Sequence, residues 1–160
     1  YYVHAVEDEA PTTVPPRFSD WAEVHPDGVF EFRNLAETRY NLLARSDLLG
    51  FSFAPGIAPG EELTLTLHPA SRIEITVLGP DGARISGARV AVSAIGGRKA
   101  RGVFGRSSTE GKVELFAPAG SLEIKAVKDD DLEGVVRIAA QEGARIAAEV
   151  VLHAVRPANE

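Results

Sequence analysis

The segment "STEGKVELFAPAGSLEIKAVK" (residues 108–128) contains a turn, a short alternating pattern, a second turn and a longer alternating pattern, in that order. The segment "HPDGVFEFRNLAETRYNLLAR" (residues 25–45) repeats this order. Alternation of apolar and polar residues with period two is typical of a strand that is buried on one face. The chain therefore predicts two copies of one small β unit. The matching positions are Asp27-Gly28 with Glu110-Gly111, Phe30 and Phe32 with Val113 and Leu115, and Tyr40, Leu42 and Ala44 with Leu122, Ile124 and Ala126.

The repeat extends beyond these two segments. The stretch "GEELTLTLH" (60–68) matches "GARIAAEVVLH" (143–153), and the offset between the copies drifts only from 82 to 85 residues. A repeat of that length indicates tandem domains, because the units of a solenoid are shorter. We therefore expect a first domain over residues 1–69 and a second over residues 70–157, with the boundary near Pro69-Ala70.

The rest of the pattern is that of an all-β chain. Short alternating runs are separated by Gly- and Pro-rich turns, which is typical of a β-sandwich with half-buried antiparallel strands. The helix-friendly stretch "RIAAQEGARIAAEVV" (137–151) is broken by Gly143, so two strands and a turn fit it better. The clearest alternating runs are Leu63, Leu65 and Leu67; Ile73, Ile75 and Val77; and Leu122, Ile124 and Ala126.

The two copies differ at their starts. The second begins with "SRIEITVLGPDGARISGARVAVSAI" (71–95), which predicts a strand, a turn and another strand. The first begins with "YYVHAV" (1–6), which matches "RVAVSA" (89–94) in the second strand of that pair. The first copy therefore lacks the opening strand. We expect an exposed sheet edge or an unfilled core slot there, unless upstream residues or another chain supply the strand.

The order of these elements resembles that of the carboxypeptidase regulatory-like domains, which are prealbumin-like (transthyretin-like) Greek-key sandwiches. The resemblance implies two tandem domains of this type, the first without its opening strand. It also implies non-catalytic modules of secreted or envelope-exposed bacterial proteins. The residues that match the family pattern are Val77, Gly82, Gly87-Ala88 and Val90 in the opening, Thr109-Glu110-Gly111 and Asp27-Gly28-Val29-Phe30 in the second element, and Tyr40, Leu42 and Ala44 in the third.

Two chemically active groups of proteins are similar to this fold, and their motifs are missing from the sequence. The transthyretin-related hydroxyisourate hydrolases carry a C-terminal Tyr-Arg-Gly-Ser motif, which does not occur here. The collagen-adhesin repeats form an isopeptide from a Lys on the first strand, where this chain has only Arg72 as a basic residue. We therefore expect no enzyme and no internal isopeptide, and a hydrolase accessory domain ranks last among the possible functions.

Composition limits the partners. The 160 residues carry a net charge of −6, which argues against nucleic acid as an electrostatic partner. No apolar run approaches the roughly 18 residues needed to cross a bilayer. The absence of Cys excludes disulfides and thiol chemistry, and the absence of Met leads us to expect a mature or excised piece of a longer protein. We expect no cofactor and no bound metal.

The candidate ligand site is a basic, Gly-rich loop. Residues 1–69 have a net charge of −7, whereas residues 70–160 have a net charge of +1. Within the second copy, "GGRKARGVFGR" (96–106) concentrates basic side chains that can pair with carboxylate, sulfate or phosphate. A mobile loop that keeps the protein soluble and a loop that faces the acidic first copy are the alternatives. The candidate residues are Arg98, Lys99, Arg101 and Arg106.

Other chemistry-bearing residues are assigned structural roles. An exposed sugar platform and a buried core are the two interpretations of the aromatic residues Trp21, Phe18, Tyr1 and Tyr2, and we expect Trp21 in a core. One of the adjacent Tyr1 and Tyr2 should be exposed, because neighbours on a strand point to opposite faces. The run "KDDDLEG" (128–134) lacks the spacing of a calcium loop and predicts a solvated turn. Duplication explains the equivalent His68 and His153 without a metal, and His4, His25 and Phe18 are not assigned to a site.

The sequence predicts non-catalytic β-sandwich modules of a larger secreted or envelope protein. They would act as a spacer or as a unit that docks a glycan, an acidic polymer or a protein partner. The alternative is an assembly module that accepts a strand from another chain at its incomplete first copy.

Overall fold

The computed structural model describes residues 2–8 and 19–155; Tyr1 and Phe18 lie outside these ranges. The described residues form strands joined by turns and irregular segments, which confirms the all-β prediction. They contain no helix that is long and apolar enough to cross a membrane. The strands are β1 (Tyr2–Glu7), β2 (Ser19–Glu23), β3 (Tyr40–Ser46), β4 (Gly50–Ile57), β5 (Ser71–Leu78), β6 (Arg89–Ile95), β7 (Arg98–Lys99), β8 (Phe104–Arg106), β9 (Lys112–Ala117), β10 (Gly120–Lys128), β11 (Leu132–Ala140), β12 (Arg145–Val151) and β13 (His153–Ala154).

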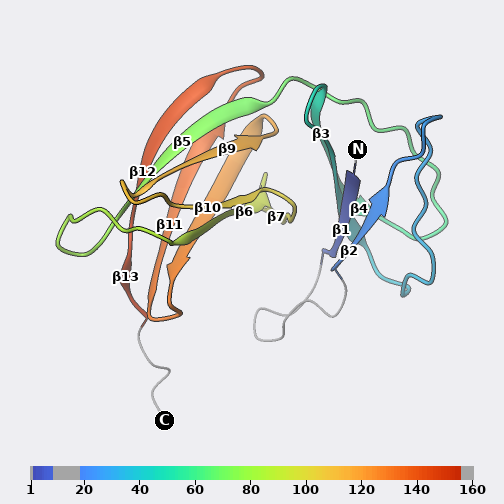
Figure 1. Cartoon of the computed structure of the whole chain (residues 1–160). Coiled ribbons are helices and arrows are strands. Elements are labelled where there is room, and N and C mark those ends of the chain that lie inside the picture. The colour runs from blue at the N-terminus through green and yellow to red at the C-terminus, as the bar shows by residue number, and fades with distance from the viewer. Residues whose placement is uncertain (1, 9–18, 156–160) are drawn as a thin grey trace, which may run out of the picture.

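The N-terminal half (residues 2–69) contains one antiparallel sheet of order β2-β1-β3-β4, on the right in Figure 1. The repeat aligns β1 with β6 and β3 with β10, and their neighbours in the sheets follow the same scheme. The sheet β2-β1-β3-β4 thus has the order of β8-β6-β10-β11 in the C-terminal half. The repeat in the sequence therefore corresponds to a repeated order of strands in the structure. The division into domains at residues 69 and 70 stays a prediction.

The C-terminal half (residues 70–155) is a sandwich of two sheets, on the left in Figure 1. One sheet has the order β13-β11-β10-β6-β7, with β8 also paired to β6, and the other has the order β12-β5-β9. Alternate residues of β5 and β10 meet in one buried cluster. The inward residues Ile73, Ile75 and Ile124 are fully buried there. The predicted pair of strands across Gly143 is also confirmed, as β11 and β12.

One strand pairing departs from the expected antiparallel arrangement. Strand β5 is antiparallel to β9, but it runs parallel to β12. The chain leaves β5 at Leu78 and returns beside it at Arg145, after six intervening strands (β6 to β11), which gives it the long crossover that a parallel pair requires. β5 is therefore the central strand of its sheet, with a partner on each side.

The second layer of the N-terminal half differs from the prediction. Residues 29–34 and 60–67, which correspond to β9 and to β12, were expected to be strands, and this is wrong. Their counterparts form strands by pairing with β5, and the described part of residues 2–69 contains no strand in that place. The two segments still alternate and place apolar side chains on the sheet. Those side chains are Phe30, Phe32, Leu63, Leu65 and Leu67, packed on Val3, Ala5, Tyr40, Leu42 and Ala44.

A matched pair of leucines tests this difference between the halves. Leu152 is fully buried, whereas its repeat equivalent Leu67 is only partly buried. We expect Leu152→Ala to lower the free energy of unfolding by about 2–5 kcal/mol, and Leu67→Ala to cost clearly less because water already reaches that side chain. Urea denaturation followed by circular dichroism measures both. Equal losses would mean that Leu67 lies in a fully packed core.

Candidate functional site

Strand β3 is buried on both of its faces. Tyr40, Leu42 and Ala44 pack against the outer segments of the N-terminal half. Leu43 points the opposite way and joins the core cluster of the C-terminal half, together with Phe51 of β4. That cluster also contains Ala100 and Val103 of the loop after β7. The N-terminal sheet is therefore a middle layer, and its inner face is the interface between the two halves.

Asn41 is the polar centre of this interface. The side chain is 1% exposed. Its Nδ2 donates to the Asp8 carboxylate and to the backbone oxygen of Lys99, both at 2.9 Å. Its Oδ1 accepts from the backbone N–H of Gly56 at 3.0 Å. One buried amide thus joins the ends of β1 and β4 to β7 in the C-terminal half, and its hydrogen-bonding groups are satisfied, as burial demands.

Charged groups surround Asn41 in the interface. The carboxylate of Asp8 is 4% exposed and forms an ion pair with Arg98. Arg45 of β3 donates to the backbone oxygen of Gly102 at 3.4 Å. The basic loop therefore faces the acidic N-terminal half. This is the arrangement in which its charges contact the first copy. A charge buried this far is stabilised only while its partner remains.

The four candidate ligand residues fall into different surroundings. Arg98 pairs with Asp8, and the backbone of Lys99 is bonded to Asn41. Arg106 donates to the backbone oxygen of Gly87 at 2.9 Å, and Arg101 is exposed. The structure thus does not gather the four basic groups around one point. Their role in binding stays a prediction.

His4 of β1 lies against Gly102 of the C-terminal half. A Cβ atom added to Gly102 would stand 2.6 Å from the imidazole Cδ2 of His4, so only glycine fits there without movement. Gly102 also has a φ of +108°. Burial, and then the charge of Arg45, lower the pKa of His4 from its ordinary value of 6.5. The folded protein therefore favours the neutral imidazole.

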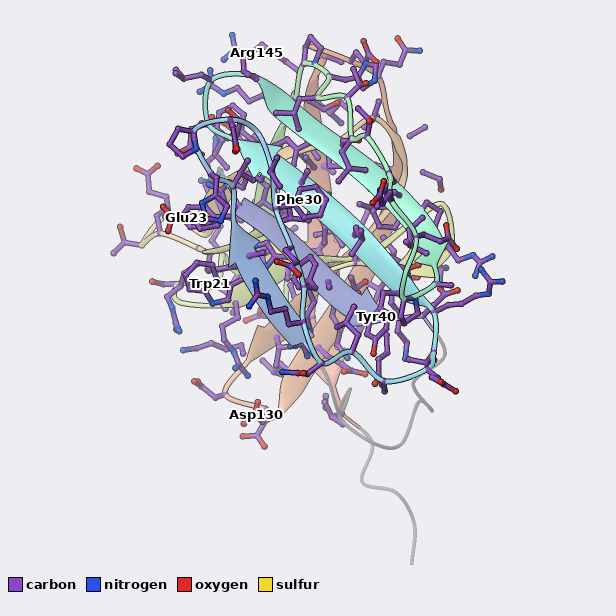
Figure 2. The ribbon with its side chains drawn as sticks, turned by 90° about the vertical axis from the view of Figure 1, so that its right-hand side faces the viewer. Trp21, Glu23, Phe30, Tyr40, Asp130 and Arg145 are labelled. Carbon is purple, nitrogen blue, oxygen red and sulfur yellow. The ribbon has the colours of Figure 1, made fainter. Side chains whose placement is uncertain are left out.

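Trp21 does not lie in a core, which makes that prediction wrong. The side chain is 57% exposed on the edge strand β2. Tyr2, its diagonal neighbour on β1, is 46% exposed, and the two rings meet edge to face with centroids 5.4 Å apart. Figure 2 shows Trp21 beside the outer edge of the sheet, with Glu23 next to it on the same strand.

A shallow depression begins at Trp21. It runs between the end of β2 and the extended segment that follows. Its floor and rim combine an aromatic ring with carboxylates, an imidazole and a guanidinium, which is a mixture suited to hydroxyl-rich ligands. Its lining residues include Trp21, Glu23, His25, Glu31, Phe32 and Arg33.

The remaining candidates have structural surroundings. Residues 129–131 form the predicted turn between β10 and β11, with Asp129 and Asp130 at positive φ and Asp130 paired to Arg89 at 2.9 Å. His68 lies 3.0 Å from Glu142 across the connection between the halves. Within residues 2–8 and 19–155, no group of three or more His, Asp or Glu side chains could hold a metal ion.

The alternating pattern does not predict the Asn41 interface, although the sequence carries a signal for it. In "RYNLLAR" (39–45) the apolar run Leu42-Leu43-Ala44 breaks the alternation, whereas "SLEIKAV" (121–127) keeps it. A continuous apolar run indicates a strand buried on both faces. Which element covers the second face could not be read from the run.

The surroundings of His4 predict that the stability of the protein depends on pH. Because its folded pKa lies below 6.5, the unfolded chain binds the proton more tightly, and stability falls as the pH drops from 6.5 through the folded pKa. We expect the wild type to lose more stability between about pH 7.5 and 5.5 than His4→Gln does. Urea denaturation at both values measures the difference, with the exposed His25→Gln as control. An equal loss in wild type and His4→Gln would contradict this.

Comparisons with known proteins give weak similarities. No family model matches the chain, and no curated protein matches it, so the resemblance to carboxypeptidase regulatory-like domains stays a prediction. Among solved structures, it is similar to the minor pilin GBS52 of Streptococcus agalactiae (10% identity, TM-score 0.38, covering 99% of this chain and 84% of that one). It is also similar to the TIE protein of Bacillus anthracis (14% identity, TM-score 0.41, covering 96% and 34%). Similarities of this size assign neither a family nor a function.

Proposed function

We propose that the chain is a non-catalytic β-sandwich module of a larger secreted or envelope protein, and that its two halves act together as a stiff spacer. The observation that carries this proposal is the shared interface. Leu43 and Phe51 of the N-terminal sheet are buried in the same cluster as Val103. A spacer must hold its ends at a fixed separation, and a buried interface with a satisfied polar centre supports that.

The connection between the halves supports the same function. The backbone N–H and oxygen of His68 are both bonded to Phe51, at 2.8 and 2.9 Å. The His68 imidazole reaches Glu142 of the C-terminal half. A short connection that is tied at both sides restricts hinge motion, whereas independent domains need a linker with few contacts.

The stiffness can be measured directly, because the chain contains no Cys. Spin labels on Glu37→Cys and Glu149→Cys, both exposed positions in opposite halves, report one distance distribution by pulsed electron resonance. We expect a single narrow distribution that broadens in Asn41→Ala, since removing the amide takes one hydrogen bond each from the Lys99 oxygen, the Asp8 carboxylate and the Gly56 N–H, and costs about 1–3 kcal/mol. Exposed Glu62→Ala is the control. A broad distribution in the wild type would reject the spacer.

A second candidate function is glycan docking at the pair Trp21 and Tyr2. Exposed aromatic rings beside polar groups are suited to stack on sugar rings, and both features occur together at the depression that begins at Trp21. We therefore propose Trp21 and Tyr2, ahead of the basic loop, as the candidate glycan-binding site. Arg98 of that loop is already engaged with Asp8.

The single Trp of the chain makes this candidate easy to test. We expect a panel of soluble glycans to include one that changes the intrinsic Trp fluorescence in a saturable way, because a bound sugar would cover an indole that is 57% exposed. Binding followed by calorimetry should be lost in Trp21→Ala and kept in Phe104→Ala, a matched exposed aromatic elsewhere. Binding that is lost in Arg101→Ala but kept in Trp21→Ala would move the site to the basic loop.

A further inference from the structure

The outer face of the N-terminal sheet carries two extended segments, and no strand formed by residues 2–8 or 19–155 lies between them. We call the region between residues 30–33 and 63–67 the strand slot. Figure 2 looks onto this face and shows Phe30 over the sheet, between the two segments. By the repeat, the first segment corresponds to β9 and the second to β12. The C-terminal half therefore supplies a template for what fills this place.

In the template, β5 fills the equivalent slot. It pairs antiparallel with β9, where Ile75 lies opposite Val113, and parallel with β12, where Val77 lies beside Val150. Its odd-numbered amide groups face β9, as in the bond from the N–H of Val77 to Gly111. Its even-numbered amide groups face β12, as in the bond from the N–H of Arg72 to Ala144.

The strand slot differs in two ways from the place that β5 occupies in the C-terminal half. Among the described residues, no backbone hydrogen bond joins 30–34 to 62–67. The apolar side chains are also less covered than their counterparts: Leu65 is partly buried, whereas the equivalent Val150 is 1% exposed. Unpaired strand edges with alternating apolar side chains are the sites that accept an added strand.

We propose that the strand slot binds a separate extended peptide with the alternation of β5. The peptide runs antiparallel to residues 30–33 and parallel to residues 63–67. This inference does not rest on the spacer function, because the slot lies on the face of the sheet opposite the interface. It does not rest on the glycan function either, although Glu31, Phe32 and Arg33 belong both to the slot and to the depression that begins at Trp21. Its occupant is defined by chemistry: apolar side chains at every second position, and polar ones between them.

The template also fixes the register. The peptide residue equivalent to Ile75 lies opposite Phe30, and the one equivalent to Ile73 lies opposite Phe32. In the C-terminal half Arg72 pairs with Glu114, whose repeat equivalent is Glu31. A basic residue at the position of Arg72 is therefore favoured in the partner.

The alternative is that aromatic side chains of the N-terminal half already fill the strand slot. Phe30 and Phe32 are larger than their counterparts Val113 and Leu115, and their rings pack edge to face with centroids 6.2 Å apart. If these rings substitute for the strand, an added peptide gains nothing. The experiment must therefore separate a slot that accepts a strand from one closed by its own aromatics.

The probe is a fluorescent peptide of the sequence "SRIEITVL", identical to β5, added to the full chain. We expect saturable binding with a dissociation constant in roughly the micromolar range, measured by fluorescence anisotropy. A peptide with Ile73→Ser and Ile75→Ser should not bind. Absence of binding by the first peptide would overturn the proposal in favour of the self-filled slot.

Backbone methylation distinguishes a central slot from a single edge. Methyl on the amide nitrogen of the peptide's Ile75 blocks the ladder to 30–33, and methyl on that of Glu74 blocks the ladder to 63–67. A strand in the slot uses both ladders, so each methyl group should weaken binding about tenfold. Loss with only one of the two would place the peptide on an edge strand and overturn the slot.

Hydrogen exchange locates the peptide without altering the protein. We expect residues 30–34 and 62–67 to exchange fast in the free chain and slowly with the peptide bound, while β5 stays unchanged. Leu65→Glu in the slot should abolish binding, and Val135→Glu, at an exposed position of β11, should not. Protection elsewhere, or a dimer that forms without peptide and protects the same residues, would overturn the assigned occupant.

Discussion

The buried amide of Asn41 is the contact on which the arrangement of this protein depends. It satisfies the Lys99 oxygen from one half while it holds Asp8 and Gly56 from the other. Asp8 in turn is a nearly buried carboxylate whose partner is Arg98. In such a network, the loss of one member removes hydrogen bonds from several buried polar groups at once. The geometry of the interface is therefore specified much more tightly than apolar contact alone would require.

The equivalent strands β3 and β10 differ in what covers one of their faces. In the C-terminal half, the residues of β10 equivalent to Asn41 and Leu43 are Glu123 and Lys125. These face outward and pair with Arg137 at 2.7 Å and with Glu133 at 2.7 Å. Surface ion pairs of this kind contribute little to stability. In the N-terminal half the corresponding face is an interface, so a solvated surface of one copy corresponds to a contact surface of the other.

The two faces of the N-terminal sheet thus have opposite characters. The inner face is closed by the C-terminal half through Leu43 and Phe51. The outer face is covered by extended segments that pack their apolar side chains but form no ladder. A closed inner face suits a rigid module, and an outer face with unpaired backbone suits strand addition. Both properties follow from one sheet that packs between its own outer segments and the C-terminal half.

The sequence by itself determined the class of fold, the repeat and most strand positions. These features depend on the local alternation of apolar and polar residues and on turn residues, both of which can be read from short stretches of the sequence. It did not determine that 29–34 and 60–67 fail to become strands, because a strand is defined by its partner and no strand of the described N-terminal half stands between them. It placed Trp21 in a core, since a large aromatic is usually buried, and only the edge position of β2 decided otherwise.

The interface was decided by tertiary structure alone. The run Leu42-Leu43-Ala44 signals burial on two faces, but Lys99, Arg98 and Gly102 lie more than fifty residues away in the sequence. Contacts at such separations depend on how two preformed sheets dock, and docking depends on shape and on the pairing of buried polar groups. Local pattern is therefore enough to identify the strands of this protein, whereas only the packed structure shows which of their faces meet.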